Sequence, residues 1–242
     1  MKKLHKFFIP IEIFLLFVIV CRYMEDRLMD KLTHVTAEYF KEDERTVPVS
    51  AEGKEMEQGE AKKVALTFDD GPNECYTEEL LDGLAAKGVK ATFFLIGKKV
   101  VESPEIVERI FQEGHLIGNH SYDHVNLNEM SKEAACEQIK KTNEEIKKVT
   151  GTHPEYLRPP FGSFKKNLDS DMNMIEVLWD IDPRDWSVKN TGKVVNRVVT
   201  NVQDGDIILL HDEYATSVAA AMEIIDILKS QGYEFVTVDE LI

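Results

Sequence analysis

Two adjacent acids, Asp69 and Asp70, end a short apolar stretch at 65–68, and Gly71-Pro72 stops that stretch. The end of a strand at the rim of a parallel sheet holds polar side chains where α/β proteins bind ligands. Two neighbouring carboxylates repel each other when both are ionised, so the pKa of one rises unless a cation compensates. An ordinary Asp-Gly turn would also explain these residues. The pair therefore indicates a functional site only if other reactive groups lie close to it.

Two histidines provide such groups. His120 and His124 are separated by three residues, a spacing that on a helical turn puts both on one face, where they could bind one cation. A solvent-facing pair is the alternative. One carboxylate from the first strand end would complete a two-His, one-carboxylate site with an open position for water. The cation would lower the pKa of that water and polarise a carbonyl oxygen, while the second carboxylate accepts the water's proton.

A third histidine, His211, ends another apolar stretch at 207–210. A histidine at that position could protonate a leaving amine. The alternative is a buried, hydrogen-bonded histidine with no part in chemistry.

The elements that must position these residues alternate between strand and helix patterns. The repeat predicts an α/β fold with a parallel sheet wrapped by helices, and this many strands favours a closed or partly closed (β/α) barrel. Chemistry in such barrels lies at the carboxyl ends of the strands. The expected strands are 64–68, 91–96, 116–118, 156–158, 175–179, 207–210 and 234–236, and the expected helices are 77–86, 104–113, 132–150, 191–202 and 218–230.

The amino terminus stands apart from this pattern. Lys2, Lys3 and Lys6 precede an apolar run at 7–20, which is typical of a secretory signal. No small-x-small cleavage site follows, so we expect residues 1–22 to be a signal segment or an uncleaved membrane anchor with the remainder exported. A buried amphipathic helix is the alternative. Residues 23–62 are mixed and acidic and predict a stalk, with a short helix at 24–40 or a β-hairpin at 46–51. The domain itself would span 63–242.

Composition argues against several kinds of partner and site. A formal net charge of −15 argues against nucleic acid as a partner, because phosphate binding needs basic patches. The three cysteines have no zinc-site spacing. At most one disulfide, between Cys75 and Cys136, could form inside the domain, and ordinary small side chains are the simpler interpretation.

Five short motifs occur in a fixed order along the domain. They are 67–72 (TFDDGP), 120–124 (HSYDH), 158–162 (RPPFG), 182–186 (DPRDW) and 209–211 (LLH). The set resembles the motifs of the polysaccharide deacetylase family, also called the NodB-homology domain or carbohydrate esterase family 4. The resemblance covers about 63–242 and implies a distorted (β/α) barrel of the NodB-homology type, with fewer strands than eight.

The resemblance also implies a role for each motif residue. Asp69 would be the general base, held ionised by Arg158, and His211 the general acid, its charged form supported by Asp185. The implied metal ligands are Asp70, His120 and His124. The implied contacts with the substrate are the backbone N–H of Phe161 at the oxyanion, with Trp186 and Leu209 around the acetyl methyl group. Trp186 could instead be a core aromatic.

Together these expectations describe an exported, membrane-anchored, monomeric metallohydrolase. It would remove N-acetyl groups from N-acetylglucosamine units of a cell-surface polysaccharide, with peptidoglycan first. The cofactor would be one divalent cation, zinc first, with cobalt, manganese, nickel and iron as alternatives. Alternative functions are deacetylation of chito-oligosaccharides, of another surface polysaccharide or of O-acetyl esters, and non-catalytic glycan binding.

Overall fold

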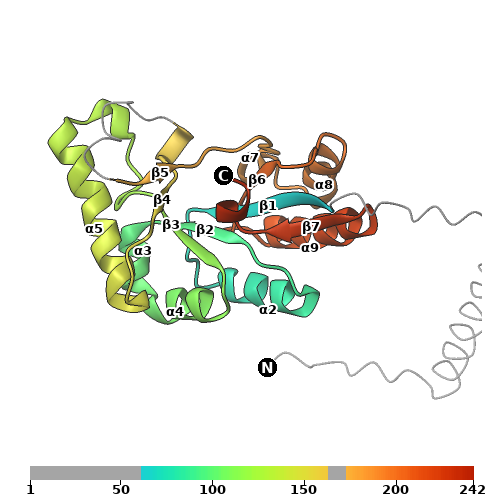
Figure 1. The fold of residues 1–242 in the computed structure, drawn as a ribbon, viewed down its shortest axis with the longest axis horizontal. Helices are drawn as coiled ribbons and strands as arrows, with labels where there is room; N and C mark the ends of the chain where they lie inside the picture. The colour runs from blue at the N-terminus through green and yellow to red at the C-terminus, as the bar shows by residue number, and fades with distance from the viewer. Residues whose placement is uncertain (1–60, 163–172) are drawn as a thin grey trace, which may run out of the picture. The chain divides into compact units, whose positions relative to one another are not determined.

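A single parallel sheet forms the centre of the protein. The computed structural model describes residues 61–162 and 173–242. Six strands are hydrogen-bonded in the order β5-β4-β3-β2-β1-β6, and β7 pairs with the first half of β1. Every strand pair is parallel, and helices pack around the sheet (Figure 1). The predicted α/β class and partly closed barrel are therefore confirmed.

The bounds of the strands lie close to the expected ones. They are β1 Lys62–Asp69, β2 Thr92–Leu95, β3 Leu116–Asn119, β4 Tyr156–Leu157, β5 Ile175–Glu176, β6 Ile207–His211 and β7 Tyr233–Val236. The α-helices are α2 Thr77–Lys87, α3 Gly97–Glu102, α4 Pro104–Gln112, α5 Lys132–Thr150, α7 Asp185–Val188, α8 Thr191–Val199 and α9 Ala215–Ser230. Short 3-10 turns lie at Leu127–Glu129, Pro160–Gly162 and Val238–Glu240.

The alternation of side chains along β1 separates the core from the site. Leu66 and Phe68 are buried in the large cluster that joins the sheet to its helices. Thr67 and Asp69 have the opposite phase, and both accept hydrogen bonds from one buried arginine. Fully burying each apolar side chain contributes about 1.5–3 kcal/mol. The same strand is therefore anchored by one face and carries the chemistry on the other.

An irregular crossing completes the barrel. The expected strand 175–179 pairs only at its start, as β5, and the chain then crosses from β4 to β6. On one side the N–H of Val177 donates to the carbonyl of Leu157 at 2.9 Å, and on the other the N–H of Leu209 donates to the carbonyl of Ile181 at 2.9 Å. This stretch is not a regular strand because its backbone groups divide between two edges.

Two short helices were not expected from the sequence. α3 follows β2 directly, and α7 forms inside the stretch predicted as an acidic turn. The start of α5 matches its prediction, with the side chain of Ser131 accepting a hydrogen bond from the N–H of Ala134. Gly151 ends this helix at φ 81°, a left-handed conformation that glycine adopts without strain.

The predictions for the amino terminus lie outside the described residues. These are the signal segment or anchor at 1–22, and the stalk at 23–62 with its helix at 24–40 or hairpin at 46–51, except that residues 61 and 62 are described and Lys62 is the first residue of β1. Within 61–162 and 173–242, no helix has the length and apolar character needed to span a bilayer.

Candidate active site

Asp69 and Asp70 differ in environment although they are neighbours. Asp69 ends β1 and is 3% exposed. Asp70 has φ 72°, a left-handed conformation that turns its carboxylate away from the alternation of the strand. The Nζ of Lys99 donates to the carbonyl of Asp70 at 2.8 Å and holds that turn. The local backbone therefore gives the two carboxylates different partners.

Arg158 is the partner of Asp69. Its guanidinium is fully buried, with Nη1 2.8 Å from Oδ1 of Asp69 and 2.7 Å from the hydroxyl of Thr67. The other nitrogens donate to the carbonyls of Val177 and Leu178, in the crossing that completes the barrel. Burial lowers the pKa of Arg158, and the charge of Asp69 opposes that shift. An arginine keeps its charge in proteins, so Asp69 faces a fixed cation.

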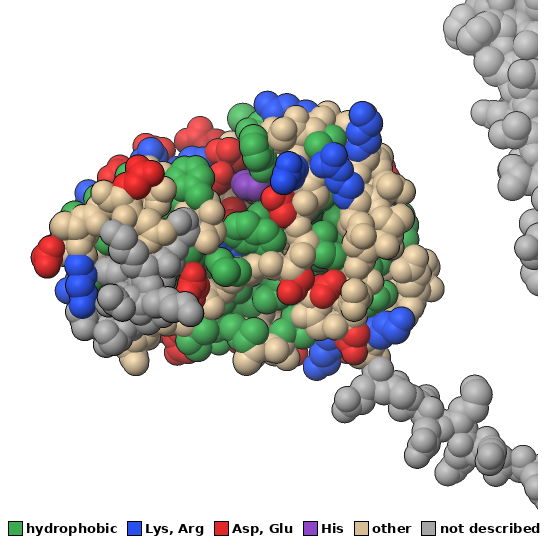
Figure 2. Space-filling view, turned by 90° about the horizontal axis from the view of Figure 1, so that it is seen from above, with side chains coloured by type: hydrophobic (Ala, Val, Ile, Leu, Met, Phe, Trp, Pro, Cys, Tyr) green, Lys and Arg blue, Asp and Glu red, His purple; other side chains and the backbone are tan. Residues whose placement is uncertain are grey.

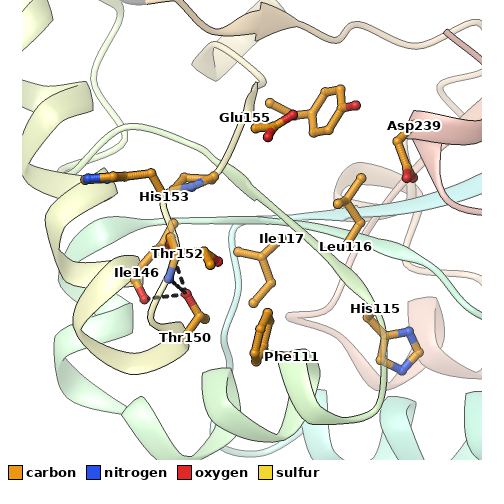
Figure 3. A pocket seen from close by; sticks show the side chains of 12 residues that line it. Phe111, His115, Leu116, Ile117, Ile146, Thr150, Thr152, His153, Glu155 and Asp239 are labelled. Carbon is orange, nitrogen blue, oxygen red and sulfur yellow. Dashed lines mark hydrogen bonds between the residues drawn. The ribbon is translucent and has the colours of Figure 1, made fainter.

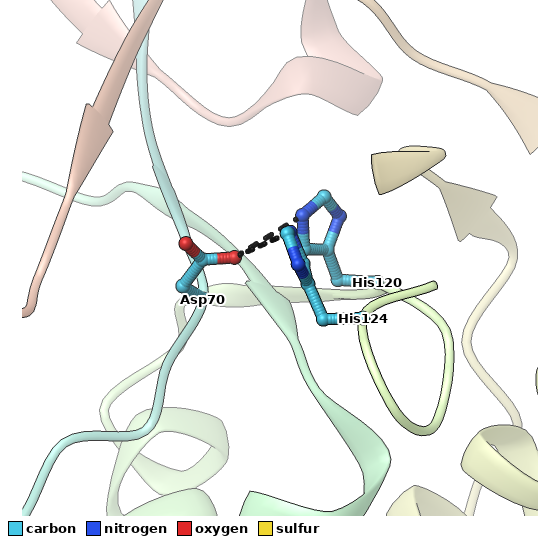
Figure 4. A group of neighbouring side chains, drawn as sticks. All are labelled: Asp70, His120 and His124. Atoms are coloured by element: carbon cyan, nitrogen blue, oxygen red, sulfur yellow. Dashed lines mark ion pairs between the residues drawn. The ribbon is translucent and has the colours of Figure 1, made fainter. Parts of the chain in front are cut away.

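The two histidines of the second motif converge without a helix. The expected helical turn over 120–124 is wrong, because Ser121 (φ 62°) and His124 (φ 54°) are left-handed and reverse the chain within a loop. The imidazole centroids of His120 and His124 are nevertheless 5.1 Å apart. Both rings face Asp70, whose Oδ1 lies 3.4 Å from Nε2 of His120 and 3.1 Å from Nε2 of His124 (Figure 4).

This loop is held by α5 and by the end of β3. Oε1 of Gln138, on α5, accepts hydrogen bonds from the N–H groups of Tyr122 (3.1 Å) and Asp123 (2.9 Å). Nε2 of Gln138 donates to the carboxylate of Asp123 at 3.0 Å. At the start of the loop, Oδ1 of Asn119 accepts from the N–H of Ser121 at 2.8 Å. Tyr122 and Asp123, which lie between the two histidines, thus shape the loop.

The three side chains fit a divalent cation. Asp70, His120 and His124 each offer one ligand atom, and these atoms lie within 4.8 Å of one another. Nδ1 of His120 is 2.7 Å from the carbonyl oxygen of Arg158, which fixes its proton there and leaves Nε2 free as a ligand. Oδ1 of Asp70 is buried and has no hydrogen-bond partner among the described residues. A buried, unpartnered carboxylate oxygen beside two imidazoles suits a metal.

The electrostatics of Asp70 agree with this arrangement. Burial raises the pKa of its carboxyl group, but the imidazoles of His120 and His124, 3.4 and 3.1 Å from Oδ1, outweigh burial and lower it well below its usual range. Asp70 is therefore ionised, as a ligand must be.

His211 lies at the end of β6 and forms a pair with Asp185. Its Nδ1 is 2.8 Å from Oδ1 of Asp185, and Oδ2 of the same carboxylate accepts from the N–H of His211 (2.9 Å) and the hydroxyl of Ser217 (2.6 Å). Burial lowers the pKa of His211, but Asp185, with smaller contributions from Asp69 and Asp70, raises it to about 9. His211 thus carries a proton at neutral pH.

All ten predicted site residues lie in this region, most of them along one cleft of about 390 Å³. Leu209 is buried at its wall, whereas Trp186 is 50% exposed and Phe161 66%, so Trp186 is not a core aromatic. The edge of the Phe161 ring packs on His124, with the ring centroids 4.9 Å apart. Arg158 and Asp185 lie behind the lining, in contact with Asp69 and His211.

Several residues of the site were not predicted from the sequence. Trp179, Glu213 and Tyr214 also line the cleft, as does Asp182, which the fourth motif already contained. Gln138 and Ser217 support it from α5 and α9, and nothing in their local sequence marks them, because only the folded chain brings those helices to the loops. Thr67 lies within the first motif, two residues before Asp69, so strand alternation could have identified it.

A second hollow, of about 340 Å³, opens elsewhere, where β3 and β4 begin (Figure 3). Its lining includes His115, His153, Glu155 and Asp239, and none of the predicted site residues. The chemistry predicted from the sequence therefore does not extend to it.

The two cysteines within residues 61–162 and 173–242 do not line the cleft. Cys75 and Cys136 are both free, so the possible disulfide does not form and they are ordinary side chains.

Comparison with known proteins gives the same picture as the geometry. A family model described as polysaccharide deacetylase matches residues 56–177. The peptidoglycan-N-acetylglucosamine deacetylase PgdA of Listeria monocytogenes is 40% identical over 198 residues, which is 81% of this chain and 42% of the relative. The peptidoglycan-N-acetylmuramic acid deacetylase PdaC of Bacillus subtilis is 45% identical over 180 residues, 74% of this chain and 38% of the relative. The chain thus spans about two fifths of the length of these relatives.

A solved structure of PdaC allows a comparison of folds. It covers 75% of this chain and 90% of its own, with a TM-score of 0.73 and 44% sequence identity. The curled parallel sheet and its helices are therefore shared with this protein.

Proposed function

Since the chain belongs to the polysaccharide deacetylase family, we propose that it removes N-acetyl groups from N-acetylglucosamine residues of a cell-surface polysaccharide, with peptidoglycan as the first substrate. One observation carries this proposal. A carboxylate held by a buried arginine, a two-His, one-carboxylate cluster and a protonated histidine all meet at one cleft. These are the groups that hydrolysis of an amide needs.

The metal ligands in this proposal are Asp70, His120 and His124. A divalent cation bound there supplies a Lewis acid that lowers the pKa of water and polarises the acetyl carbonyl. Zinc is our first candidate because the site offers imidazole and carboxylate ligands; cobalt, manganese, nickel and iron accept the same donors.

The protein's own groups carry the proton transfers. Asp69, paired with the guanidinium of Arg158, accepts a proton from the attacking water, whose oxygen forms a bond to the acetyl carbon. His211 then donates its proton to the sugar nitrogen as the carbon–nitrogen bond breaks, releasing acetate and a free amine. Asp185 keeps that proton available, because it stabilises the charged form of His211.

The remaining roles concern the substrate. We assign the backbone N–H of Phe161 to the oxyanion that forms when water adds to the carbonyl. Trp186 and Leu209 enclose the acetyl methyl group, an assignment supported by their position in the cleft. A flat aromatic and a buried aliphatic side chain exclude water around that group.

A second candidate differs in the sugar. PdaC is named for N-acetylmuramic acid, whereas PgdA is named for N-acetylglucosamine, and both resemble this chain to a similar degree. Deacetylation of N-acetylmuramic acid is therefore the competing proposal. Both sugars occur in one polymer, so analysis of the fragments from treated peptidoglycan decides which of them has lost acetate.

For the whole chain, we propose a catalytic domain at 63–242, a stalk at 23–62 and a signal segment or membrane anchor at 1–22. The basic start and apolar run support export. An exported enzyme would act outside the cytoplasm, where the relatives' polymer lies, and we expect it to be monomeric. Fractionation of cells that express the full chain checks the anchor.

Acetate release is the test of the activity. The full chain is assayed on N-acetylated peptidoglycan and on chito-oligosaccharides, after treatment with a chelator and after zinc or cobalt is returned. We expect release that the chelator abolishes, that the metal restores and that the Asp69→Asn variant lacks. Equal release by the chelated protein, or by Asp69→Asn, would exclude the proposed chemistry.

A further inference from the structure

A group of basic residues lies beside the cleft in an otherwise acidic chain. The formal net charge is −15, yet the only acid between Asp182 and Asp204 is Asp185, which is buried and bonded to His211. The same interval holds four basic residues, all exposed: Arg184, Lys189, Lys193 and Arg197. We call these four the α7–α8 basic surface. Figure 2 shows Lys and Arg side chains gathered beside a histidine near the centre of one face.

The charges of this surface are not neutralised by ion pairs. None of its four residues forms a salt bridge with an acidic side chain in 61–162 or 173–242. By contrast, Arg109 and Lys99 elsewhere in the domain are paired with glutamates. The α7–α8 basic surface therefore keeps its positive charge available to a ligand.

The two arginines of this surface border a hollow next to the cleft. Arg184 and Arg197 line about 440 Å³ together with Asp180, Asp182 and Asn201. Asp182 also lines the cleft, so the two depressions share a wall. A polymer unit that leaves the cleft on this side reaches the arginines directly.

The acids of this hollow are partly satisfied by the backbone. Oδ2 of Asp180 accepts from the N–H of Ile207 at 2.8 Å, and Oδ1 of Asp182 accepts from the N–H of Arg184 at 2.7 Å. Such bonds compensate part of each carboxylate's charge. Two arginines line the hollow with these two acids, and Lys189 and Lys193 add two further cations to the surface, which leaves it positive.

The side chains of Arg197 and Lys189 are also held in place. Nη1 of Arg197 donates to the carbonyl of Pro183 at 2.7 Å. Nζ of Lys189 lies 4.4 Å from the ring centroid of Tyr214, which lines the cleft. Arg184 is fixed at φ 57° by the turn into α7. A pre-positioned cation loses less entropy when it binds an anion.

We propose that the α7–α8 basic surface binds anionic groups, carboxylates or phosphodiesters, that the glycan substrate carries next to the sugar in the cleft. This rests on the proposed function and adds a substrate class to it: an anionic glycan rather than a neutral one. Positive charge at the rim speeds the encounter with such a polymer and fixes its register.

The test compares charged and neutral substrates in the full chain. Lys189→Gln/Lys193→Gln and Arg184→Gln remove charge from the surface, and Lys140→Gln/Lys147→Gln is the matched control, since both lysines are exposed on α5. KM and kcat are measured on solubilised peptidoglycan strands and on neutral chito-oligosaccharides, at low and high salt. We expect Lys189→Gln/Lys193→Gln to raise KM for the strands about tenfold, as the loss of two exposed charge contacts would, and Arg184→Gln, which removes one charge, to raise it about threefold. The ratio of kcat/KM for strands to that for chito-oligosaccharides should fall, and the salt dependence should weaken.

The source of the anion is read from the substrate. Strands freed of phosphodiester polymers by acid retain only carboxylates, so an effect that survives this treatment identifies carboxylates, and an effect lost with it identifies phosphodiesters. Equal changes on charged and neutral substrates, or changes that the control variant reproduces, would overturn the proposal.

Failure of the proposed function can be told apart from failure of this surface. If the unaltered protein releases acetate from no substrate, its sedimentation with insoluble peptidoglycan replaces turnover as the readout. Binding that the surface variants lose and the control keeps supports the basic surface without the activity. Binding that is the same in all three variants contradicts it.

Discussion

Arg158 serves the fold and the site with one guanidinium. It bridges Asp69 to the carbonyls of Val177 and Leu178, so the cation that pairs with the proposed base also contacts the irregular crossing of the barrel. We expect Arg158→Met to lower the free energy of unfolding by about 3–5 kcal/mol, because it leaves a buried carboxylate without its cation. Urea unfolding followed by circular dichroism measures this change.

The double variant separates charge from shape. In Asp69→Asn/Arg158→Met the uncompensated carboxylate is absent, so we expect part of the lost stability to return although activity does not. If the double variant is no more stable than Arg158→Met, loss of the ion pair does not explain the lower stability. The lost hydrogen bonds from Arg158 to the carbonyls of Val177 and Leu178 then explain it.

The proton on His211 makes the activity depend on pH. Because Asp185 raises the pKa of His211 to about 9, the proposed acid is protonated below that pH, and kcat should fall as pH rises through about 9. In Asp185→Asn this alkaline limb should move toward the usual histidine value of about 6.5. Profiles of kcat between pH 5 and 10 locate the limb, and Ser217→Ala, which removes one weaker partner of Asp185, is the comparison.

The raised pKa of His211 also makes the stability of the fold depend on pH. A raised pKa in the folded state means that the pair contributes most below about pH 6.5 and loses its contribution as pH rises through about 9. Asp185→Asn should therefore cost more stability at pH 6 than at pH 10. An equal cost at both values would mean that His211 does not titrate as its contacts require.

At the scale of elements, α5 positions the metal loop through Gln138. The carboxamide oxygen accepts hydrogen bonds from two backbone N–H groups of the loop, and the carboxamide nitrogen donates one to the carboxylate of Asp123. Removing the carboxamide therefore frees the segment between the two histidines. We expect Gln138→Ala to weaken metal binding about 10- to 100-fold, the usual effect of removing a group that orients metal ligands.

Calorimetric titration of the metal-free protein with zinc measures this affinity. Glu137→Ala, the exposed neighbour on the same helix, is the control and should bind as the unaltered protein does. Unchanged affinity in Gln138→Ala would mean that the left-handed residues of the loop, and not Gln138, hold the loop in its conformation.

The sequence predicted elements best where local and tertiary signals agree. α5 starts after the Ser131 cap and ends before a glycine, so both of its bounds are local and match. α3 was missed because its six residues contain two valines and too little periodicity to register as a helix. The strand expected at 175–179 is mostly absent because its pairing is set by two distant edges, which no local pattern reports.

The site was predicted through its motifs and not through its local geometry. His120 and His124 do converge, but by two left-handed residues in place of a helical turn, so the right residues came with a wrong reason. Side-chain types at strand ends are visible in a sequence. The supports on α5 and α9 depend on long-range packing and were not visible.

For the whole molecule, the proposed metal site joins parts of the chain that are distant in sequence. Asp70 follows β1, and the histidines follow β3, with β2 between these strands in the sheet. A cation that binds these ligands only in the folded state stabilises the domain by mass action, by about 2.7 kcal/mol at a free concentration 100 times its Kd. For a domain of this size, each kcal/mol raises Tm by about 2–4 °C.

We therefore expect the chelated protein to melt about 5–10 °C below the protein in excess zinc. Calorimetry or thermal circular dichroism at fixed pH measures the difference, and it requires no knowledge of the substrate. The His124→Ala variant should lose most of the shift, because it removes a ligand that is partly exposed and packs little of the core. A metal-dependent shift of the same size in that variant would place the stabilising cation at other groups of the chain. The site would then be a set of hydrogen-bonded side chains, and the proposed hydrolysis would lose its Lewis acid.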